Sequence, residues 1–293
     1  MLLKINSLNV QYGKTTALNI LSPITFEKGD RIGVIGSNGA GKSTLIKSLL
    51  GIVRYTGSID STIAPLDMAV HMQFNEYTDS MAVKYVMEAI LQTKLKNNRR
   101  LQELISYFEF EKCLNKKYKN LSGGQKQRFT IILVMMQDAP LTFYDEVTSG
   151  LDFETRQRLV EKLVSWYKDK ETTLCIVSHY YDELEHLTNK LMILEQGRVV
   201  DFGDKDELFM KYCGRAIILI DNTEANQLIT NKYAKLEAPN HLIAISCNTQ
   251  ELEMEISTLL IKNNVNYKRS NNDIEMIFIN ARKQAALGGV INE

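Results

Sequence analysis

Residues 36–44 read Gly-Ser-Asn-Gly-Ala-Gly-Lys-Ser-Thr, and this stretch constrains the fold more than any other part of the chain. It matches the pattern G-x-x-x-x-G-K-[ST], in which glycines let backbone N–H groups approach a phosphate closely. The apolar run at 31–35 is typical of a buried strand, and residues 44–50 have the spacing of a helix that stops at Gly51. Such a helix presents N–H groups and the positive end of its dipole to an anion. A plain glycine-rich turn would not need the complete pattern, so the stretch predicts a phosphate site for ATP or GTP.

Within this loop, Lys42 is expected on the β- and γ-phosphates, and the Ser43 hydroxyl is expected on Mg²⁺. The residues predicted to bind the nucleotide here are Ser37, Asn38, Gly39, Ala40, Gly41, Lys42, Ser43 and Thr44.

Length and charge limit the other functions that the chain can have. A chain of 293 residues exceeds the usual size of a single core, so one large and one small domain are expected. Lysine plus arginine equals aspartate plus glutamate at 35 each, which gives no argument for nucleic acid or an anionic membrane as a partner. Four scattered cysteines form no CxxC pair and are interpreted as reduced, buried thiols. We expect no signal peptide, and no apolar run approaches the ~18 residues of a membrane span, so a membrane role would require another chain.

The hydrophobic pattern predicts a parallel α/β core with an antiparallel β layer at its start and a helical insertion near residues 75–137. Residues 80–110 have helical periodicity, and Glu76 and Tyr77 just before them are expected on the surface. Residues 1–212 form one expected domain, residues 213–284 a small α+β accessory region, and residues 285–293 a flexible tail. In the accessory region the predicted strands are 215–220, 242–245 and 273–279, and the predicted helices are 224–234 and 250–262.

A second helix start lies at residues 121–125, Leu-Ser-Gly-Gly-Gln, ahead of a long apolar helix. Ser122 followed by Gln125 fits a capping box, so an ordinary helix start is one interpretation. Two glycines in a first turn cost about 1 kcal/mol each relative to alanine. That cost favours a second interpretation, in which the bare N–H groups of Gly123 and Gly124 meet an anion.

Polar residues also follow three expected strands. The strand 141–145 ends in Asp145 followed by Glu146, and two such carboxylates beside Mg²⁺ can divide the work of holding the metal and handling a water. His179 follows the strand 173–177, at the end of a strand where α/β proteins place ligands. Gln73 stands at the end of its own strand with the same logic. Each of these residues also has a structural alternative.

The order of these motifs resembles that of ATP-binding cassette (ABC) transporter ATPases, over about residues 1–210. The resemblance implies a P-loop NTPase fold, ATP hydrolysis and Mg²⁺, with Ser43, Gln73 and Asp145 near the metal. It implies that Glu146 is the general base, with His179, Gln73 and Lys42 also in the catalytic set. It implies that Tyr12 stacks on adenine, with a plain surface tyrosine as the alternative. Val147 replaces the proline that is usual after Asp-Glu, and Thr142 interrupts the apolar strand, but neither change touches a reacting group.

The same resemblance implies that two such domains dimerise head to tail, so that Ser122, Gly123, Gly124 and Gln125 of one subunit close on ATP held by the other. It also implies an integral membrane permease as partner, and a cytoplasmic location on the inner face of the membrane through that permease. Residues 273–278, Asp-Ile-Glu-Met-Ile-Phe, resemble the ending of ATPases in drug, bacteriocin and antimicrobial-peptide exporters, such as the phenol-soluble modulin exporters.

Three alternatives stay open at this point. A ribosome-associated ABC ATPase would normally carry two cassettes and basic linkers, and a DNA-associated one would carry a long coiled coil between the phosphate loop and Ser122. The third alternative is an importer ATPase. The sequence does not identify the transported substrate, and it leaves open whether the two cassettes are identical.

Overall fold

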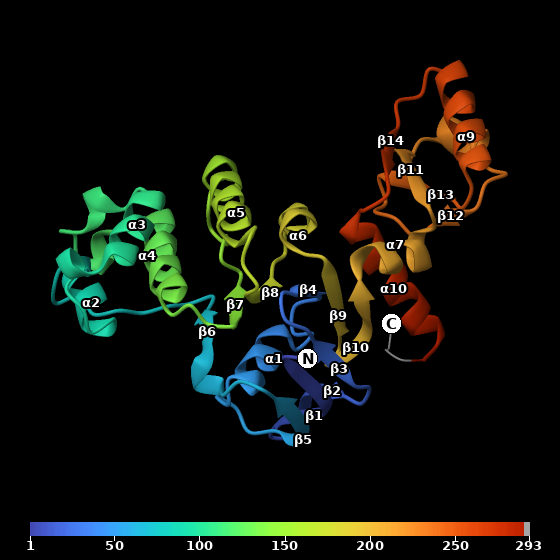
Figure 1. Ribbon diagram of the computed structural model, residues 1–293. Helices are drawn as coiled ribbons and strands as arrows, with labels where there is room; N and C mark the ends of the chain where they lie inside the picture. Colours follow the sequence, from blue (N-terminus) through green and yellow to red (C-terminus); the bar gives the residue numbers. More distant parts are fainter. Residues whose placement is uncertain (290–293) are drawn as a thin grey trace.

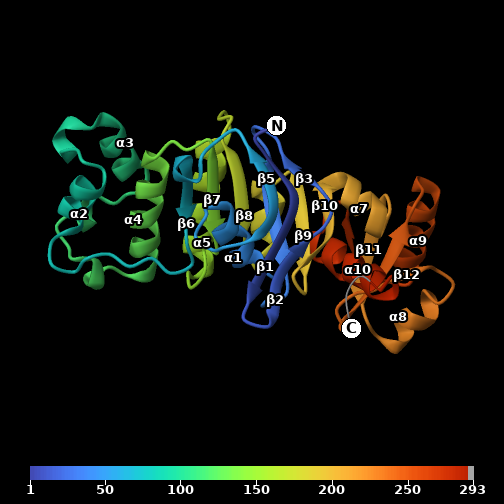
Figure 2. The same cartoon turned by 90° about the horizontal axis from the view of Figure 1, so that it is seen from below.

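The computed structural model describes residues 1–289, which form a central α/β core with a lobe on either side. Figure 1 shows a helical lobe next to β6 and a C-terminal lobe beyond β10, and Figure 2 shows the same order from below. The antiparallel β1, β2, β3 and β5 lie beneath the core in Figure 1.

The core is a six-stranded sheet in the order β10-β9-β4-β8-β7-β6, in which only β10 runs antiparallel to its neighbour. Its strands are β4 (Arg31–Gly36), β6 (Met68–His71), β7 (Leu141–Asp145), β8 (Thr173–Val177), β9 (Lys190–Glu195) and β10 (Arg198–Asp204). β7 and β8 are buried at every position, as expected of strands that are covered on both faces. The helices α1 (Lys42–Leu49), α5 (Phe153–Tyr167), α6 (Tyr181–Leu187) and α7 (Lys205–Cys213) belong to this core.

A second sheet packs against the core below α1. It consists of β1 (Leu3–Tyr12), β2 (Thr15–Ile20), β3 (Ile24–Phe26) and β5 (Thr56–Ser61), with β1 in contact with all three others. The buried side chains of β1, including Leu3, Ile5 and Leu8, share one hydrophobic cluster with α1 and β4. Alternate side chains of β1 therefore point toward α1, the helix that follows the phosphate loop, and form an apolar face there.

The helical lobe contains α2 (Val83–Ile90), α3 (Arg99–Tyr107) and α4 (Gly123–Met136). Short 3-10 turns lie at Pro65–Asp67, Leu95–Asn97, Glu111–Cys113 and Tyr118–Asn120. The prediction that Tyr77 lies exposed on the surface is wrong. Its ring is half-buried and packs on Tyr118 and Phe129, with ring centroids 5.0 and 4.9 Å away. Burial of this aromatic group stabilises the lobe, while Glu76 is exposed as expected.

The C-terminal lobe is a β-α-β-β-α-β unit with the sheet order β12-β13-β11-β14, the ferredoxin-like arrangement. Its elements are β11 (Ala216–Asp221), α8 (Glu224–Ile229), β12 (Lys235–Leu236), β13 (Leu242–Cys247), α9 (Gln250–Lys262) and β14 (Lys268–Ser270). Ala216, Ile218 and Ile220 on β11 pack with α9. Ile217 and Leu219, on the opposite face of β11, belong to the large cluster that includes the last helix.

That last helix, α10 (Ile274–Leu287), corrects two predictions. Residues 273–279 are not a strand, because Asp273 caps a helix through a 3.0 Å bond from the Met276 N–H to its carboxylate. The predicted tail begins too early, because Ala285 is buried within this helix. Residues 290–293 of that tail lie outside the described residues.

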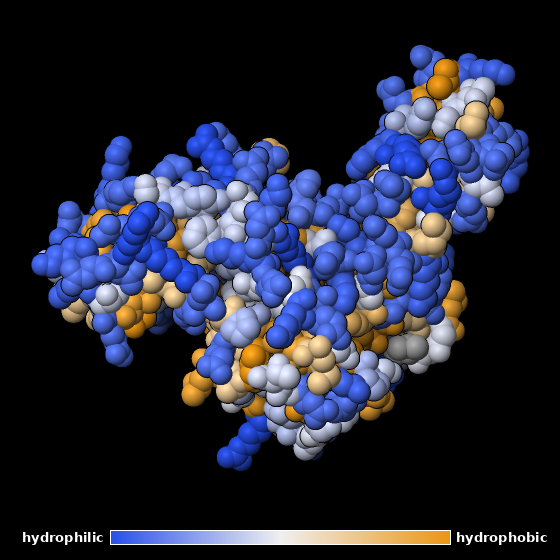
Figure 3. Space-filling model, viewed as in Figure 1, coloured by the Kyte–Doolittle hydropathy of each residue, from blue (hydrophilic) through white to orange (hydrophobic). Residues whose placement is uncertain are grey.

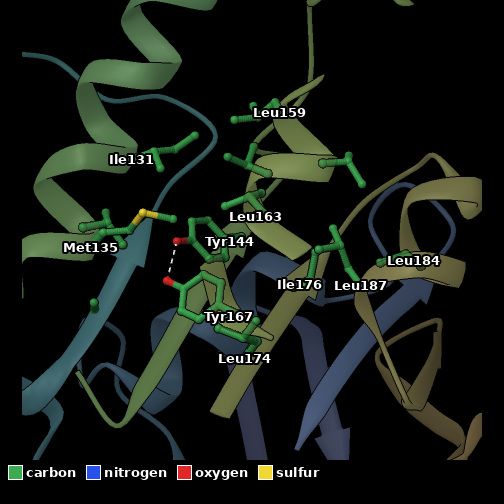
Figure 4. Packing of buried hydrophobic residues seen from close by; sticks show 14 of the residues in the cluster. Ile131, Met135, Tyr144, Leu159, Leu163, Tyr167, Leu174, Ile176, Leu184 and Leu187 are labelled. Carbon is green, nitrogen blue, oxygen red and sulfur yellow. Dashed lines mark hydrogen bonds between the residues drawn. The ribbon is translucent and has the colours of Figure 1, made fainter. Parts of the chain in front are cut away.

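The large core between α4, α5 and the sheet contains a buried tyrosine pair. Figure 4 shows Tyr144 and Tyr167 pointing toward each other among apolar side chains such as Leu163 and Met135. Their hydroxyl groups are 2.8 Å apart, and Tyr144 is only 1% exposed. Each hydroxyl therefore satisfies the hydrogen-bonding need that burial creates in the other.

We expect Tyr167→Phe to lower the free energy of unfolding by about 1–2 kcal/mol, because it leaves the Tyr144 hydroxyl buried without this partner. The double change Tyr144→Phe and Tyr167→Phe is expected to recover part of that loss, since it removes both polar groups. Denaturant unfolding of the purified protein measures both effects, with the exposed Tyr85→Phe as a control. A double variant that is destabilised by the sum of the two single changes would contradict this assignment.

Candidate functional site

The parallel strands β4, β6, β7, β8 and β9 all end at one edge of the sheet, and polar residues follow each of them. β4 leads into the phosphate loop, and β6 is followed by Met72 and Gln73. Asp145 closes β7, His179 lies two residues beyond β8, and Glu195 closes β9. The carboxyl ends of a parallel sheet are where α/β proteins collect the groups that contact a ligand.

The phosphate loop needs glycine at two positions for steric reasons. Gly41 has a φ of 104°, and a Cβ there would lie 2.8 Å from the carbonyl oxygen of Ala17. A Cβ on Gly36 would lie 2.1 Å from the carbonyl oxygen of Leu194. The loop is therefore wedged between β2 and the end of β9, and only a chain without these side chains can follow its path.

The other loop residues differ in exposure. Asn38 and Gly39 are exposed at the tip, while Ser37, Ser43 and Thr44 are half-buried. Ala40 is 2% exposed and packs into the core below the loop. Of the nucleotide-binding residues predicted here, Ala40 therefore offers its backbone rather than its side chain to a ligand.

Lys42 is buried at the start of α1, and its ammonium group donates to the carbonyl oxygens of Gly36 (2.7 Å) and Ser37 (3.0 Å). Burial lowers the pKa of Lys42 below its usual value. Nearby negative charges act in the opposite direction, in the order Glu146, Asp145 and Glu195. The loop thus holds a buried positive charge that faces carboxylates and can neutralise a phosphate.

Ser43 and Asp145 are direct neighbours, because the Ser43 hydroxyl donates to Oδ2 of Asp145 at 2.9 Å. Burial raises the pKa of the Asp145 carboxyl, while the bond from Ser43 lowers it and the charge of Glu146 raises it again. Two adjacent carboxylates and a hydroxyl at a buried strand end match the oxygen ligands that a divalent cation prefers. No group of three or more His, Cys, Asp or Glu side chains with metal-binding geometry occurs within residues 1–289.

Glu146 links three of the predicted residues. Its carboxylate accepts a bond from Nε2 of Gln73 at 2.7 Å and lies 3.0 Å from Nε2 of His179. Its backbone has a φ of 52°, and its N–H donates to the Val177 carbonyl at 2.9 Å, so the residue turns sharply off the end of β7. A non-glycine residue in this left-handed region is a strained conformation of the kind found at functional sites. The structure therefore brings Gln73, Glu146 and His179 together.

Ser122 and Gln125 form the predicted capping box at the start of α4. The Ser122 N–H donates to the Gln125 side chain at 3.1 Å, and the Gln125 N–H donates to the Ser122 hydroxyl at 3.4 Å. A Cβ on Gly123 would meet nothing within 4 Å, and one on Gly124 would meet only ordinary contacts at 3.4 Å and beyond. Nothing within residues 1–289 requires glycine at either position, which favours an external group that approaches the backbone.

The start of α4 does not lie in the site formed by the five strand ends. α4 belongs to the helical lobe and packs on β6, while α1 lies under the central sheet, and both views place the two helices apart. Tyr12 is also separate from the carboxylates. It ends β1, pairs with Thr15 across the hairpin and is 50% exposed.

Sequence reasoning missed Glu195. The Ser37 hydroxyl lies 2.8 and 2.7 Å from the two carboxylate oxygens of Glu195 and donates to this pair, and the Ser37 N–H donates to the same carboxylate at 3.4 Å. Nε of Arg282, on α10, lies 3.4 Å from the same carboxylate. A polar residue at the end of a predicted strand is the signal that identified Gln73, and it applies equally to Glu195.

A comparison with protein-family models matches residues 18–149 to the family described as "ABC transporter". The chain carries an ABC transporter ATPase domain. The matched range includes the phosphate loop, the Ser122 segment and the Asp145-Glu146 pair, and the predicted ATP binding and ATP hydrolysis are confirmed for this domain.

Curated relatives of the cassette include importers and exporters. The methionine import ATP-binding protein MetN of Clostridioides difficile is 29% identical over 230 residues, which cover 72% of this chain and 71% of that protein. MetN of Corynebacterium glutamicum is 32% identical over 223 residues, 69% of this chain and 61% of that protein. The linearmycin resistance ATP-binding protein LnrL of Bacillus subtilis is 26% identical over 273 residues, 87% of this chain and 85% of that protein. The chain thus spans less than two thirds of the Corynebacterium glutamicum relative.

Solved structures confirm the predicted fold class. An ATP-binding subunit of an ABC transporter superimposes with a TM-score of 0.64 at 23% identity, covering 72% of this chain and 93% of that chain. The dimeric ABC transporter cassette MJ0796 gives a TM-score of 0.62 at 20% identity, with 69% and 98% covered. Both matches leave a quarter or more of this chain uncovered.

Proposed function

We propose that this chain is the ATP-hydrolysing subunit of an exporter, and that Glu146 is the general base of its ATPase reaction. In the proposed reaction the terminal phosphate of ATP is attacked by a water, whose proton passes to the Glu146 carboxylate as the bond to ADP breaks. Gln73 and His179 orient this carboxylate through their contacts of 2.7 and 3.0 Å. Lys42 leaves its carbonyl partners to bind the phosphates.

Mg²⁺ fits the Ser43 and Asp145 side chains, with Gln73 as a third neighbour. The buried carboxylate with a raised pKa supports this assignment, because a cation relieves the cost of its charge. Bound there, Mg²⁺ would neutralise charge on the phosphates. Tyr12, exposed beside the β1–β2 turn, is proposed to stack on the adenine.

A second cassette completes each ATP site in this account. Within one chain the start of α4 is remote from the phosphate loop, and no steric contact with the described part of the chain requires its glycines. The residues Ser122 to Gln125 of the second subunit are proposed to close on ATP from the other side. Our default assignment for this second subunit is an identical chain, and a different cassette is the alternative.

A separate membrane protein is the proposed permease, with this chain held on the inner face of the membrane only through it. Within residues 1–289, no helix has both the length and the apolar composition to cross a bilayer. Figure 3 shows hydrophobic residues on the surface of the helical lobe. Phe74, between β6 and α2, is 84% exposed, and Tyr85 on α2 is 49% exposed. Phe74 directly follows Gln73, so a change at the nucleotide has a short covalent route to this surface.

Export is favoured because two of the relatives align with this chain beyond the cassette itself. LnrL aligns over 87% of this chain, which is more than residues 1–212 contain, so the similarity reaches into the C-terminal lobe. A Nod factor export ATP-binding protein of Cupriavidus pinatubonensis also covers 78% of the chain. The proposed substrates are drugs or amphipathic antimicrobial peptides. Import remains the second candidate, because the MetN proteins match the cassette at 29–32% identity.

Transport into inside-out membrane vesicles that contain this chain and its permease tests the direction. We expect ATP to drive accumulation of a labelled amphipathic peptide or lipophilic drug in these vesicles, and we expect no accumulation with Lys42→Ala. ATP-dependent methionine uptake by intact cells that is lost with the Lys42→Ala variant would contradict export and support the second candidate.

A further inference from the structure

The end of β9 places a buried carboxylate against the phosphate loop. The Glu195 side chain is 6% exposed and holds Ser37 through both the hydroxyl and the N–H of that residue. Ser37 is the second residue of the loop, and its carbonyl also binds Lys42. Glu195 is one of the three carboxylates that act on Lys42. It is therefore part of the electrostatic surroundings of any phosphate in the loop.

A buried carboxylate next to a phosphate site is unfavourable for two reasons. Its own desolvation is costly unless a positive charge or several hydrogen bonds compensate it. Its charge also repels the phosphates of a nucleotide, and this repulsion is screened less in a buried site than in water. The hydroxyl and the N–H of Ser37 donate hydrogen bonds that reduce the cost of desolvation. These groups carry no net charge, so they do not cancel the repulsion of the phosphates.

Arg282 supplies the positive charge, and it comes from the last helix of the chain. Its guanidinium lies 3.4 Å from Glu195 and stacks over Phe278, with 5.5 Å to the ring centroid. The helix α10 is held in place from both sides. It packs on α6, α7, β9 and β10 of the core, and its apolar residues Ile277 and Ala281 share a cluster with Ile217 of the C-terminal sheet. The position of Arg282 is thus fixed by the C-terminal lobe and the core together.

We propose that Arg282 is a positioning residue of the nucleotide site, which neutralises Glu195 and keeps the phosphate loop favourable for ATP. The proposal rests on the nucleotide site described above and extends it to a part of the chain outside the ABC transporter family match. It makes ATP affinity dependent on how α10 is seated. A movement of the C-terminal lobe that withdraws Arg282 would weaken ATP binding without touching a residue of the loop.

Four variants of the full-length chain separate this electrostatic role from a merely structural one. Arg282→Gln removes the charge, and Arg282→Lys keeps it. The double change Glu195→Gln with Arg282→Gln removes both charges and the ion pair together. Lys283→Gln is the matched control, because Lys283 is the next residue on α10 and pairs with Glu237 of the C-terminal lobe at 2.6 Å.

ATP affinity is measured by titration calorimetry with Mg²⁺ present, and the melting temperature of each variant without nucleotide is measured alongside it. We expect Arg282→Gln to weaken ATP binding on the order of threefold to tenfold, because the charge that neutralises Glu195 is lost. The effect is no larger because solvent screens the partly exposed arginine. Arg282→Lys is expected to stay near wild type, the double variant to regain most of the affinity, and Lys283→Gln to bind as wild type does.

Two results would overturn the proposal. One is an Arg282→Gln variant that binds ATP as tightly as wild type. The other is a double variant that binds no better than Arg282→Gln, since that result assigns the loss to the broken contact between α10 and the core. A wild-type chain that fails to bind ATP would instead refute the proposed nucleotide site itself, so the two failures are distinguishable.

Discussion

Glu146→Gln is expected to reduce ATP hydrolysis by at least ~10²-fold while ATP binding is retained, because that is the usual scale for loss of a general base. An amide at this position keeps the shape of the side chain and can still accept a bond from Gln73. The amide is neutral and far less basic than a carboxylate, so it does not take the proton of the attacking water. Phosphate release by the purified chain with its membrane partner measures the effect.

Two further variants show that the loss is specific. Lys42→Ala is expected to weaken ATP binding itself, because it removes a full positive charge from the phosphates. Glu154→Gln, which changes an exposed carboxylate paired with Arg158 on α5, is expected to leave hydrolysis unchanged. Near-wild-type turnover by Glu146→Gln would show that another group is the base.

Ser122→Arg is expected to reduce hydrolysis on the order of 10²-fold, as loss of a transition-state contact does, although Ser122 is remote from the phosphate loop of its own chain. A long side chain at the start of α4 occupies the space that ATP of the second subunit needs. Loss of the helix cap alone costs about 1 kcal/mol. Ser122→Ala removes the cap and the hydroxyl without adding bulk, so we expect it to lose less activity than Ser122→Arg.

Mixing two inactive variants tests this composite site further. In a mixed dimer, the intact Ser122 of a Lys42→Ala chain faces ATP on the intact loop of a Ser122→Arg chain. We therefore expect the mixture to hydrolyse ATP faster than either variant alone. A Ser122→Arg variant with wild-type activity, or a mixture without any gain, would contradict completion of the site by a second subunit.

Much of the site was predictable because the end of a buried strand has a clear sequence pattern. An apolar run followed by Asp145-Glu146 or by His179 identifies a buried strand and the polar group it delivers. Parallel pairing then brings these groups to one edge, which is how Gln73 comes to contact Glu146. Which side chains touch is not contained in the pattern. The contact of Ser37 with Glu195 depends on the position of β9 beside β4.

The errors arose where short patterns are ambiguous. Residues 273–276 alternate between polar and apolar types, which is the period of a strand, and two more apolar residues follow them. The same residues place Ile274, Ile277 and Phe278 on one side of a helix, and the cap at Asp273 with burial against α7 decides in favour of the helix. Tyr77 was expected on the surface, but tertiary contacts with Tyr118 and Phe129 leave it half-buried.

The capping box at Ser122 shows why one motif can support two interpretations at once. Its side chains make the bonds of an ordinary helix start, and its glycines leave the first N–H groups uncovered. The first property stabilises α4 in the single chain. The second property has a purpose when another molecule approaches these N–H groups.

The central claim is that ATP joins two cassettes, and light scattering of the Glu146→Gln protein tests it most directly. Blocked hydrolysis keeps ATP bound, and bound ATP favours the closed dimer over separate subunits. With saturating Mg²⁺-ATP we predict the mass of a dimer, and the mass of a monomer without nucleotide or when Ser122→Arg is added. A Glu146→Gln protein that stays monomeric at saturating ATP, alone and together with a paired cassette, would contradict the account.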